Sequence, residues 1–350
     1  MPRVAVVGCG DVSIVHFEAI EAIADAELVA VCDSDQATLT AAAARYRVPG
    51  FADHRQLVDA VAPDVVHICT PHDQHADLAI DCLRAGVGVL LEKPLAHTPA
   101  EGDRVVLAAA KSGVKIGVCL QNRYNATAQA IHAALESGRL GAVLGAFGAV
   151  MWHRPAAYYQ ARPWRGRWST SGGGVMINQA IHTLDLLQWF LGEVTQFQGG
   201  VSQRLVGGDR EVEDTADLVL DHSSGARSVL FATAANGVDS PVTLEIVTEE
   251  ATLYVRGDLT ITYADGRVEI IPERVAGSGG RAYWGVSHQL LIRDFYDRLG
   301  EDKPFWISPA EAAKSLRVIG ELYARSELSV SRGSAGPPTG RNMGTRSVPD

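Results

Sequence analysis

Short runs of apolar residues alternate with helix-length amphipathic segments through the first third of the chain. Unbroken apolar runs are typical of parallel strands that are buried on both faces, and the helical segments between them supply the crossover connections. The pattern therefore predicts an α/β domain built on a doubly wound parallel sheet. The predicted strands are residues 4–7, 28–32, 65–69, 87–91 and 115–120, and the predicted helices are residues 12–24, 36–46, 74–85 and 100–112.

The pattern changes after a further predicted helix at residues 125–137. Later segments are β-rich or alternate between apolar and polar positions, and Ser-Ser-Gly, Arg-Gly-Asp and Ala-Asp-Gly provide turn signals between them. They predict an α/β domain with a large, mostly antiparallel sheet. Its strands are expected at residues 143–152, 194–205, 215–221, 226–234, 242–247, 252–255 and 267–271, and its helices at 175–191, 286–299 and 309–326.

We therefore divide the chain into a first α/β domain at residues 1–121, a second domain at residues 122–330 and a tail at residues 331–350. The tail is rich in Gly, Ser, Pro and Arg and has almost no apolar periodicity, so we expect it to be mobile.

Composition and charge narrow the class of protein. Hydrophobic residues make up 47 % of the 350 residues, and 41 acidic against 31 basic side chains give a formal charge of −10, which argues against nucleic acid or an anionic membrane as a partner. No apolar run approaches the ~18 residues of a membrane-spanning helix, and the short apolar run before Gly8 is no secretory signal. The five cysteines fit neither a disulfide framework nor a metal pair. We expect a cytoplasmic protein with reduced cysteines.

A glycine-rich loop follows the first predicted strand. Gly8-Cys9-Gly10-Asp11-Val12-Ser13 matches Gly-x-Gly-x-x-Gly except that serine takes the third glycine position, where a small residue suffices. Such a loop lets backbone N–H groups approach a pyrophosphate at the N-terminus of the next helix. The alternative is an ordinary turn between a strand and a helix.

Asp33 ends the second predicted strand, where a carboxylate accepts hydrogen bonds from the adenosine ribose of a dinucleotide. It would repel a 2′-phosphate, and no Arg or Lys follows before Arg45, so NAD is preferred over NADP. Taken alone, Asp33 could equally be a helix N-cap.

The fifth predicted strand ends in Leu91-Glu92-Lys93-Pro94. Ligands of open α/β sheets bind beyond the carboxyl ends of the strands, so Lys93 would point to the place where a nicotinamide arrives. Partial burial and a nearby cation would lower the pKa of Lys93 toward that of a useful proton donor or acceptor. The Lys93–Pro94 bond could be cis. The alternative is a surface lysine.

The predicted helix at 175–191 carries Asn178, His182 and Asp185 on one face, because their offsets are four and three residues. His182 could remove an alcohol proton, Asn178 could bind the substrate hydroxyl, and Asp185 could set the tautomer of His182. A buried core histidine is the alternative. We expect no metal site, because His72 and His75 lie on a predicted loop without an obvious third ligand.

Taken together, these motifs resemble the Gfo/Idh/MocA family, which includes glucose–fructose oxidoreductases and inositol dehydrogenases. The resemblance extends in order over residues 2–328 and rests on Gly8–Ser13, Thr70-Pro71 with His75, Glu92-Lys93-Pro94, and Gly172–Gly174 followed by Asn178, His182 and Asp185. It implies a Rossmann domain followed by an open-sheet α/β domain, often in dimers or tetramers. It also implies hydride transfer between nicotinamide and a ring hydroxyl of a sugar or cyclitol, with Lys93 and His182 in the active site.

The resemblance has one departure that matters. Many members have aspartate where this chain has Asn178, and an amide can orient a hydroxyl but cannot relay a proton. His182 or Lys93 must then act as the base alone.

Residues 152–168 hold five aromatic side chains and four arginines but no acidic residue. In an acidic protein this favours a segment that faces an anion, either the cofactor pyrophosphate or a charged substrate, while flat rings suit the C–H faces of a sugar. A segment packed across an interface is equally consistent with this composition.

The motifs, this segment and the resemblance together give the predicted site. The expected cofactor-binding residues are Gly8, Gly10, Asp11, Val12, Asp33, Thr70, Pro71, His75, Glu92, Lys93, Gln121, Trp164 and Arg165. The expected substrate-binding residues are Lys93, Arg123, Tyr124, Trp152, Tyr158, Asn178 and His182, of which Lys93, Asn178 and His182 are the catalytic candidates.

The favoured hypothesis is an NAD(H)-dependent dehydrogenase of a sugar or cyclitol. Two alternatives remain open: an NAD-dependent glycosidase that oxidises a ring carbon transiently, and a dinucleotide-binding regulator without catalytic activity.

Overall fold

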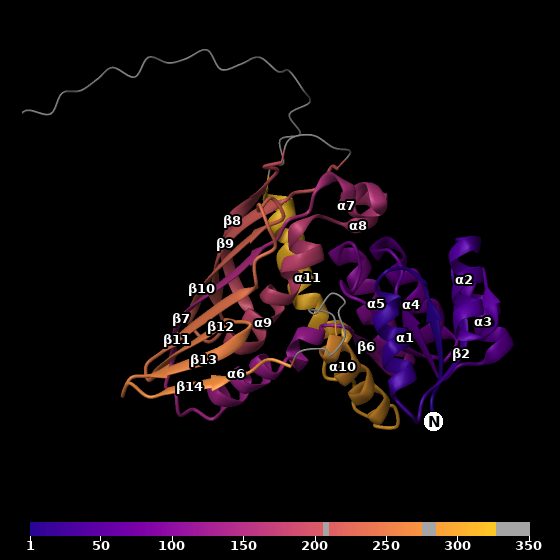
Figure 1. Ribbon diagram of the computed structural model, residues 1–350, viewed down its shortest axis with the longest axis horizontal. Coiled ribbons are helices and arrows are strands. Elements are labelled where there is room, and N and C mark those ends of the chain that lie inside the picture. Colours follow the sequence, from indigo (N-terminus) through magenta and orange to yellow (C-terminus); the bar gives the residue numbers. More distant parts are fainter. Residues whose placement is uncertain (206–209, 275–284, 327–350) are drawn as a thin grey trace, which may run out of the picture.

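The computed structural model describes residues 1–205, 210–274 and 285–326. It contains two β-sheets, with helices α9 (Ile181–Leu191), α10 (Gly285–Asp297) and α11 (Pro309–Arg325) lying between them (Figure 1). The predicted tail at 331–350 and the predicted domain end at 330 lie outside the described residues.

The first sheet is parallel, and its six strands follow the order β3-β2-β1-β4-β5-β6. This is the doubly wound Rossmann order, whose ligand crevice lies where the chain direction across the sheet reverses, between β1 and β4. The strands are β1 (Arg3–Val7), β2 (Glu27–Cys32), β3 (Gly50–Phe51), β4 (Val65–Ile68), β5 (Gly88–Leu91) and β6 (Ile116–Val118). The helices are α1 (Ser13–Ala22), α2 (Gln36–Tyr46), α3 (His54–Val61), the 3-10 helix η1 (His72–Gln74), α4 (His75–Arg84) and α5 (Pro99–Ser112).

Strand β3 and helix α3 were not predicted from the sequence. Strand β3 has only two residues, which is too short for an alternating pattern. Helix α3 has a single buried residue, Leu57, but its N-cap is well formed, since the Asp53 carboxylate accepts the backbone N–H groups of Arg55 and Gln56.

The second sheet has the order β14-β13-β12-β11-β7-β10-β9-β8, and its described strand pairs are antiparallel except for β7 with β10. The predicted mostly antiparallel open sheet is therefore confirmed. Its strands are β7 (Val143–Met151), β8 (Val194–Ser202), β9 (Thr215–His222), β10 (Arg227–Thr233), β11 (Thr243–Thr248), β12 (Ala251–Arg256), β13 (Asp258–Tyr263) and β14 (Val268–Ile271). The other elements are η2 (Gln121–Tyr124), α6 (Ala126–Glu136), α7 (Ala156–Ala161), η3 (Pro163–Gly166), α8 (Trp168–Ser171) and the π-helix η4 (Met176–Ala180).

Strand β13 was not predicted, because Arg256-Gly257-Asp258 was interpreted only as a turn signal and the next strand was expected at residues 267–271. Arg256 and Asp258 already pair across the two strands, and Gly257 alone makes the reversal with φ +82°. The left-handed conformation that glycine tolerates makes this turn short enough for the strand to resume at Asp258.

The C-terminal helices contact both sheets. Helix α10 packs on α1, and α11 packs on α5, β6, α9 and β8. Gly320 in α11 permits a close approach to α5, because a Cβ there would clash with the ring of Pro99. Because the C-terminal helices contact elements of both predicted domains, the division of the chain near residue 121 stays a prediction.

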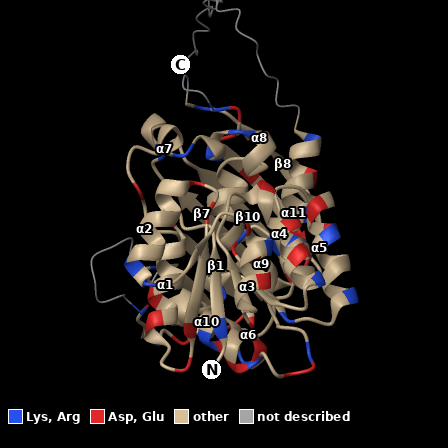
Figure 2. Ribbon diagram, turned by 90° about the vertical axis from the view of Figure 1, so that its right-hand side faces the viewer, with Lys and Arg blue, Asp and Glu red and all other residues tan. Residues whose placement is uncertain are grey.

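Charged residues of both signs are interspersed on the outer helices, as on α5 and α11 (Figure 2). All five cysteines have free thiols, and four of them are buried. Within the described ranges, no helix combines the length and the apolar character needed to cross a bilayer.

Candidate active site

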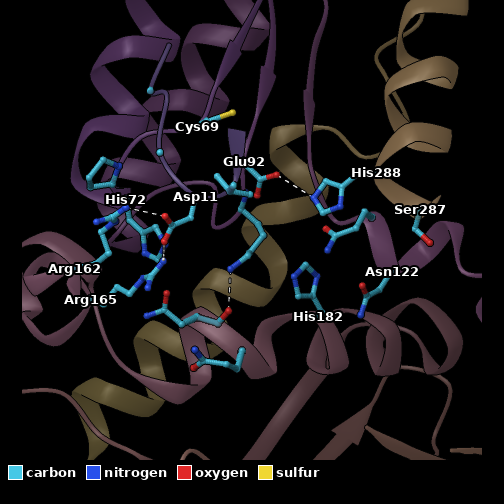
Figure 3. A pocket seen from close by; sticks show the side chains of 18 of the residues that line it. Asp11, Cys69, His72, Glu92, Asn122, Arg162, Arg165, His182, Ser287 and His288 are labelled. Carbon is cyan, nitrogen blue, oxygen red and sulfur yellow. Dashed lines mark hydrogen bonds and ion pairs between the residues drawn. The ribbon is translucent and has the colours of Figure 1, made fainter. Parts of the chain in front are cut away.

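A cavity of about 1300 Å³ is lined by the carboxyl ends of the first sheet's strands and by residues from η4, α9 and the segment 152–165. Figure 3 shows Asp11, Arg162 and Arg165 at one end of it and His182, Asn122 and Ser287 at the other. Most of the predicted site residues line this cavity: Gly8, Gly10, Asp11, Val12, Asp33, Thr70, Pro71, Glu92, Lys93, Gln121, Trp152, Tyr158, Trp164, Arg165, Asn178 and His182.

Three predicted residues, His75, Arg123 and Tyr124, are not among the lining residues, so their predicted ligand contacts are corrected. His75 is buried and places Nδ1 2.7 Å from Pro94 O and Nε2 3.0 Å from Thr70 O. The Tyr124 hydroxyl donates to Asp294 Oδ2 at 2.6 Å. These side chains hold the scaffold together, and Asp294, which lies 170 positions from Tyr124, could not be recognised as its partner from a local pattern.

Arg123 forms a buried ion-pair cluster. Its guanidinium donates to both carboxylate oxygens of Asp185, at 2.8 and 2.7 Å, and to Glu311 Oε1 at 2.9 Å. The prediction that Asp185 sets the tautomer of His182 is therefore wrong. Helix α9 turns Asp185 toward η2 and α11, whereas His182 faces the cavity.

The glycine loop is shaped for close backbone approach. Gly8 has φ +88°, and a Cβ there would lie 2.7 Å from the carbonyl carbon of Cys69, so only glycine fits. A Cβ at Gly10 would have no atom within 4 Å, which means that this position faces the open cavity. Ser13, in place of the third glycine, donates from Oγ to Gly10 O at 2.7 Å. The loop thus leaves open a space at the N-terminus of α1 that suits a pyrophosphate.

Asp33 fixes the far side of this loop. Its Oδ2 accepts the Cys9 N–H at 2.8 Å and its Oδ1 accepts the Asp35 N–H at 2.8 Å. Asp35 and Asp53 line the same end of the cavity, where the described lining includes no Lys or Arg. This end of the cavity is acidic.

Two arginines of the segment 152–168 reach the glycine loop. Arg162 donates to Asp11 Oδ1 at 2.7 Å and Arg165 to Asp11 Oδ2 at 3.1 Å. Burial would raise the pKa of Asp11, but the two guanidinium groups hold it below its usual value. Trp164 packs edge-on against His72 with ring centroids 4.8 Å apart. Of the two interpretations of this segment, its position beside the glycine loop favours the one in which it faces an anion.

Lys93 reaches across the cavity. Its peptide bond to Pro94 is cis, and its Nζ donates to the main-chain oxygen of Asn178 at 2.8 Å. Asn178 lies in the π-helical turn η4, and such turns are frequent at functional sites. Burial lowers the pKa of Lys93 and Arg165 lowers it further, whereas Glu92 opposes the change.

His182 lies one turn along the helix from Asn178. Its Nδ1 is buried and has no hydrogen-bond partner among the described residues. Burial and the charge of Lys93 lower its pKa to about 3, so the ring is a neutral imidazole at physiological pH. The Asn178 side chain donates from Nδ2 to Ser171 Oγ and Gly173 O, which leaves Oδ1 as the atom that can meet a ligand.

Two further cavity residues carry buried polar atoms without a partner in the described part of the chain, Thr70 Oγ1 and Gln121 Oε1. Buried polar atoms are nearly always hydrogen-bonded, so atoms left open inside a cavity indicate a polar ligand. Together with the open space beside Gly10, they fit a bound dinucleotide.

Several lining residues were not predicted as site residues, among them His72, Gln179 and His288. Gln179 donates to the Tyr158 hydroxyl at 3.3 Å, and His288 comes from α10, far along the chain. No local pattern marks Gln179 and His288, because the π-turn and the docking of α10 bring them to the cavity. His72 directly follows Pro71 at the end of a predicted strand, and that position is the signal that could have found it.

Comparisons with known proteins agree with this architecture. Residues 2–120 match the profile described as "Oxidoreductase family, NAD-binding Rossmann fold" of the Gfo/Idh/MocA proteins, and residues 128–254 match the C-terminal domain profile of the same family. The D-apiose dehydrogenase of Paraburkholderia graminis is 30 % identical over 66 % of this chain and 60 % of its own length. Inositol 2-dehydrogenase 2 of Saccharopolyspora erythraea is 29 % identical over 74 % of this chain and 75 % of its own.

A solved structure extends the similarity over nearly the whole chain. The WlbA dehydrogenase of Bordetella pertussis, in complex with NADH and UDP-GlcNAcA, superposes with a TM-score of 0.80 at 30 % identity, covering 94 % of this chain and 97 % of that one. Two consecutive matches to one family, spanning most of both sheets, mean that this chain belongs to the Gfo/Idh/MocA oxidoreductases.

Proposed function

We propose that this protein is an NAD(H)-dependent dehydrogenase that transfers a hydride between nicotinamide and a ring hydroxyl of a sugar, sugar derivative or cyclitol. The observation that carries the proposal is that Lys93, Asn178 and His182 share one cavity with the glycine loop. The relatives named as apiose and inositol dehydrogenases support the substrate class.

Different groups of lining residues would bind the different parts of the cofactor. The amides beside Gly8 and Gly10 would meet the pyrophosphate, with Arg162 and Arg165 neutralising its charge. Asp33, in the acidic end, would accept the adenosine ribose hydroxyls and disfavour a 2′-phosphate, which supports NAD over NADP. When bound, the nicotinamide supplies the hydride acceptor or donor.

The protein's own groups manage the proton. A neutral His182 can accept the proton of the substrate hydroxyl, because its buried Nδ1 has no hydrogen-bond partner among the described residues. The Lys93 ammonium donates one hydrogen bond to the main-chain oxygen of Asn178. It can donate another hydrogen bond to the substrate oxygen, where negative charge develops. Asn178 Oδ1 orients the hydroxyl but carries no proton, so the base role falls to His182.

The proposal is tested by offering sugars and cyclitols with NAD and following NADH absorbance. Lys93→Met and His182→Asn should each lower kcat/KM at least ~100-fold, the usual contribution of a positioned acid or base, while NADH binding persists. The matched control is Lys111→Met, an exposed lysine on α5. Full turnover in both site variants would refute the roles assigned to them.

We further propose that the protein forms homodimers or homotetramers through the outer face of the eight-stranded sheet. The register aligns Val219, Val229, Phe147, Tyr254 and Ile270, each 37–64 % exposed, along one row across the strands, and Glu245 and Thr260 also lie in this row. Exposed apolar surface is typical of an interface, and a twofold axis would pair this row with its copy. Light scattering should give a smaller assembly for Phe147→Glu but not for the control Leu107→Glu on α5; an unchanged mass would refute the interface.

A further inference from the structure

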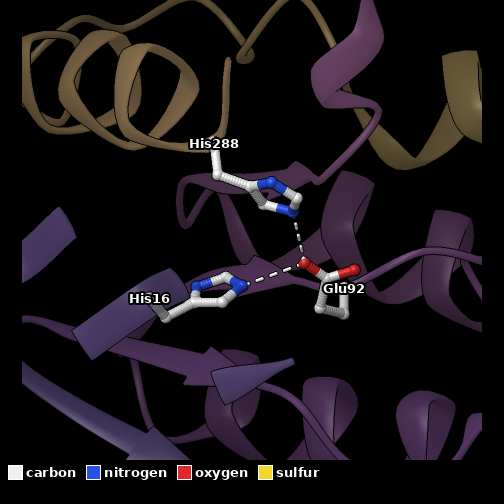
Figure 4. Close-up of side chains that lie close together, drawn as sticks. All are labelled: His16, Glu92 and His288. Atoms are coloured by element: carbon white, nitrogen blue, oxygen red, sulfur yellow. Dashed lines mark hydrogen bonds and ion pairs between the residues drawn. The ribbon is translucent and has the colours of Figure 1, made fainter. Parts of the chain in front are cut away.

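Glu92 lies beneath the cavity and is shared by two histidines. Its Oε1 is 2.9 Å from His16 Nε2, which comes from α1, and 3.2 Å from His288 Nε2, which comes from α10 (Figure 4). Its Oε2 accepts the backbone N–H of Lys93 at 3.1 Å. Glu92, His16 and His288 are 3 %, 0 % and 2 % exposed, so water does not compensate their charges.

The contacts continue away from the cavity as a chain. His16 Nδ1 is 2.9 Å from His67 Nδ1 in β4, and His67 Nε2 is 2.9 Å from the Tyr296 hydroxyl in α10. His16 and His67 are each fully buried and use both ring nitrogens in the chain.

Counting protons leaves two directions for these hydrogen bonds, which differ in whether Glu92 is ionised. A protonated Glu92 would donate to one imidazole and reverse the direction, whereas an ionised Glu92 accepts from both imidazoles at Oε1 and from the Lys93 N–H at Oε2, and we assign the ionised form. His16 then carries its proton on Nε2 and accepts at Nδ1, so His67 must be protonated on Nδ1. The Tyr296 hydroxyl donates to His67 Nε2. Every contact is satisfied when the donors point toward an ionised Glu92.

The ionisable groups in and beside this hydrogen-bonded network are consistent with an ionised Glu92 and neutral histidines. Burial lowers the pKa of His16 and that of His67, so both rings are neutral. Burial would raise the pKa of Glu92, but its two imidazole partners hold it well below the usual value. Cys69 and Cys119 also lie near the carboxylate, and burial raises the pKa of both thiols, so they stay uncharged.

We propose that Tyr296, His67, His16 and His288 form a positioning network that keeps Glu92 ionised, and that this fixed negative charge beneath the cavity keeps Lys93 protonated during catalysis. The proposal rests on the function proposed above. Lys93 otherwise sits in surroundings that disfavour its charge, because burial and the nearby Arg165 both lower its pKa. Glu92 is the carboxylate that opposes them.

The kinetic test uses the alkaline limb of the pH profile of kcat/KM, which reports the loss of the Lys93 proton. Glu92→Gln removes the charge but keeps the shape, and should move this limb about one unit toward acid pH, at the lower end of the effect of a neighbouring opposite charge. His16→Leu should shift it in the same direction, whereas His16→Gln, which keeps a donor, should restore it. The matched control is His222→Leu, which removes a buried histidine bonded to Ser228 in the second sheet. The alkaline limb of the pH profile of this variant should not move.

A measurement on the unmodified protein covers the case in which a variant fails to fold. Nitrogen NMR of labelled histidines should find His16 protonated on Nε2 and His67 on Nδ1, with neither ring titrating between about pH 6 and 9. The opposite tautomers would overturn the proposal. So would one firmly bound transition metal ion per chain, because a metal would take the lone pair of His16 Nε2.

The two proposals fail in different ways. If turnover is found but Glu92→Gln leaves the alkaline limb in place, the network is purely structural and the proposed function stands. If no substrate is turned over, the proposed function and the role of Glu92 in catalysis are both refuted, and the tautomers still decide the proton assignment of the network.

Discussion

Two glycines of the same loop should respond in opposite ways to the same added methyl group. At Gly8 the backbone has φ +88°, and the new Cβ would lie 2.7 Å from Cys69 C and 2.8 Å from Thr70 N. Those backbone atoms cannot retreat freely, because the Cys69 N–H donates to Val7 O at 2.7 Å. At Gly10 the new Cβ would meet nothing within 4 Å.

The magnitudes follow from these two environments. The left-handed conformation alone costs an L residue ~1–2 kcal/mol, and overpacking adds ~1–3 kcal/mol, so Gly8→Ala should lower the free energy of unfolding by at least ~2 kcal/mol. Gly10→Ala should be neutral or slightly stabilising, by up to ~1 kcal/mol. Its methyl group would nevertheless displace a pyrophosphate from the loop amides, and losing one or two charged hydrogen bonds at ~1.5–3 kcal/mol each weakens NADH binding by ~100-fold or more.

Thermal unfolding and NADH fluorescence titration on the same preparations separate the two effects. Gly86→Ala is the matched control: it has φ +77° and open space, and it does not line the cavity, so it should show the conformational cost without any change in NADH affinity. Wild-type NADH affinity in Gly10→Ala would refute the idea that this loop holds the cofactor. Wild-type stability in Gly8→Ala would refute the steric argument.

Three other perturbations follow from the structure. Asp33→Ser should raise the kcat/KM ratio of NADP to NAD at least ~10-fold by removing a repelling charge; an unchanged ratio would contradict its proposed contact. Arg123→Met should lower the free energy of unfolding in urea by ~3–5 kcal/mol, because it leaves Asp185 buried without its partner, and adding Asp185→Leu should restore much of the loss. Burial raises the pKa of Glu213 from 4.5 to about 7, so the folded protein keeps a proton that the unfolded chain releases between these values. Stability should therefore fall by ~3 kcal/mol as pH rises through that window, and Glu213→Gln should flatten this dependence between pH 5 and 8 in thermal unfolding; an equal slope in the variant would contradict the assignment.

Local patterns predicted most of the fold and part of the cavity. The buried strands β1, β4 and β5 were predicted because both of their faces are apolar, and the glycine loop and Lys93 were found because each directly follows such a strand. The errors share another origin. Gly257 makes a turn so short that β13 was missed, and Asp185 was assigned to His182 because the two share a predicted helix face, although that face divides between α11 and the cavity.

By itself, the sequence determined the two sheets, the strand ends at which chemistry gathers and the residue types available there, because these depend on neighbours a few positions away. Only the tertiary structure decided which side chains are paired and therefore which are charged. Arg162 meets Asp11 across 151 positions, and His288 meets Glu92 across 196. Such pairs form only when α10 and the segment 152–168 dock on the first sheet, and burial then fixes the protonation of the groups that they enclose.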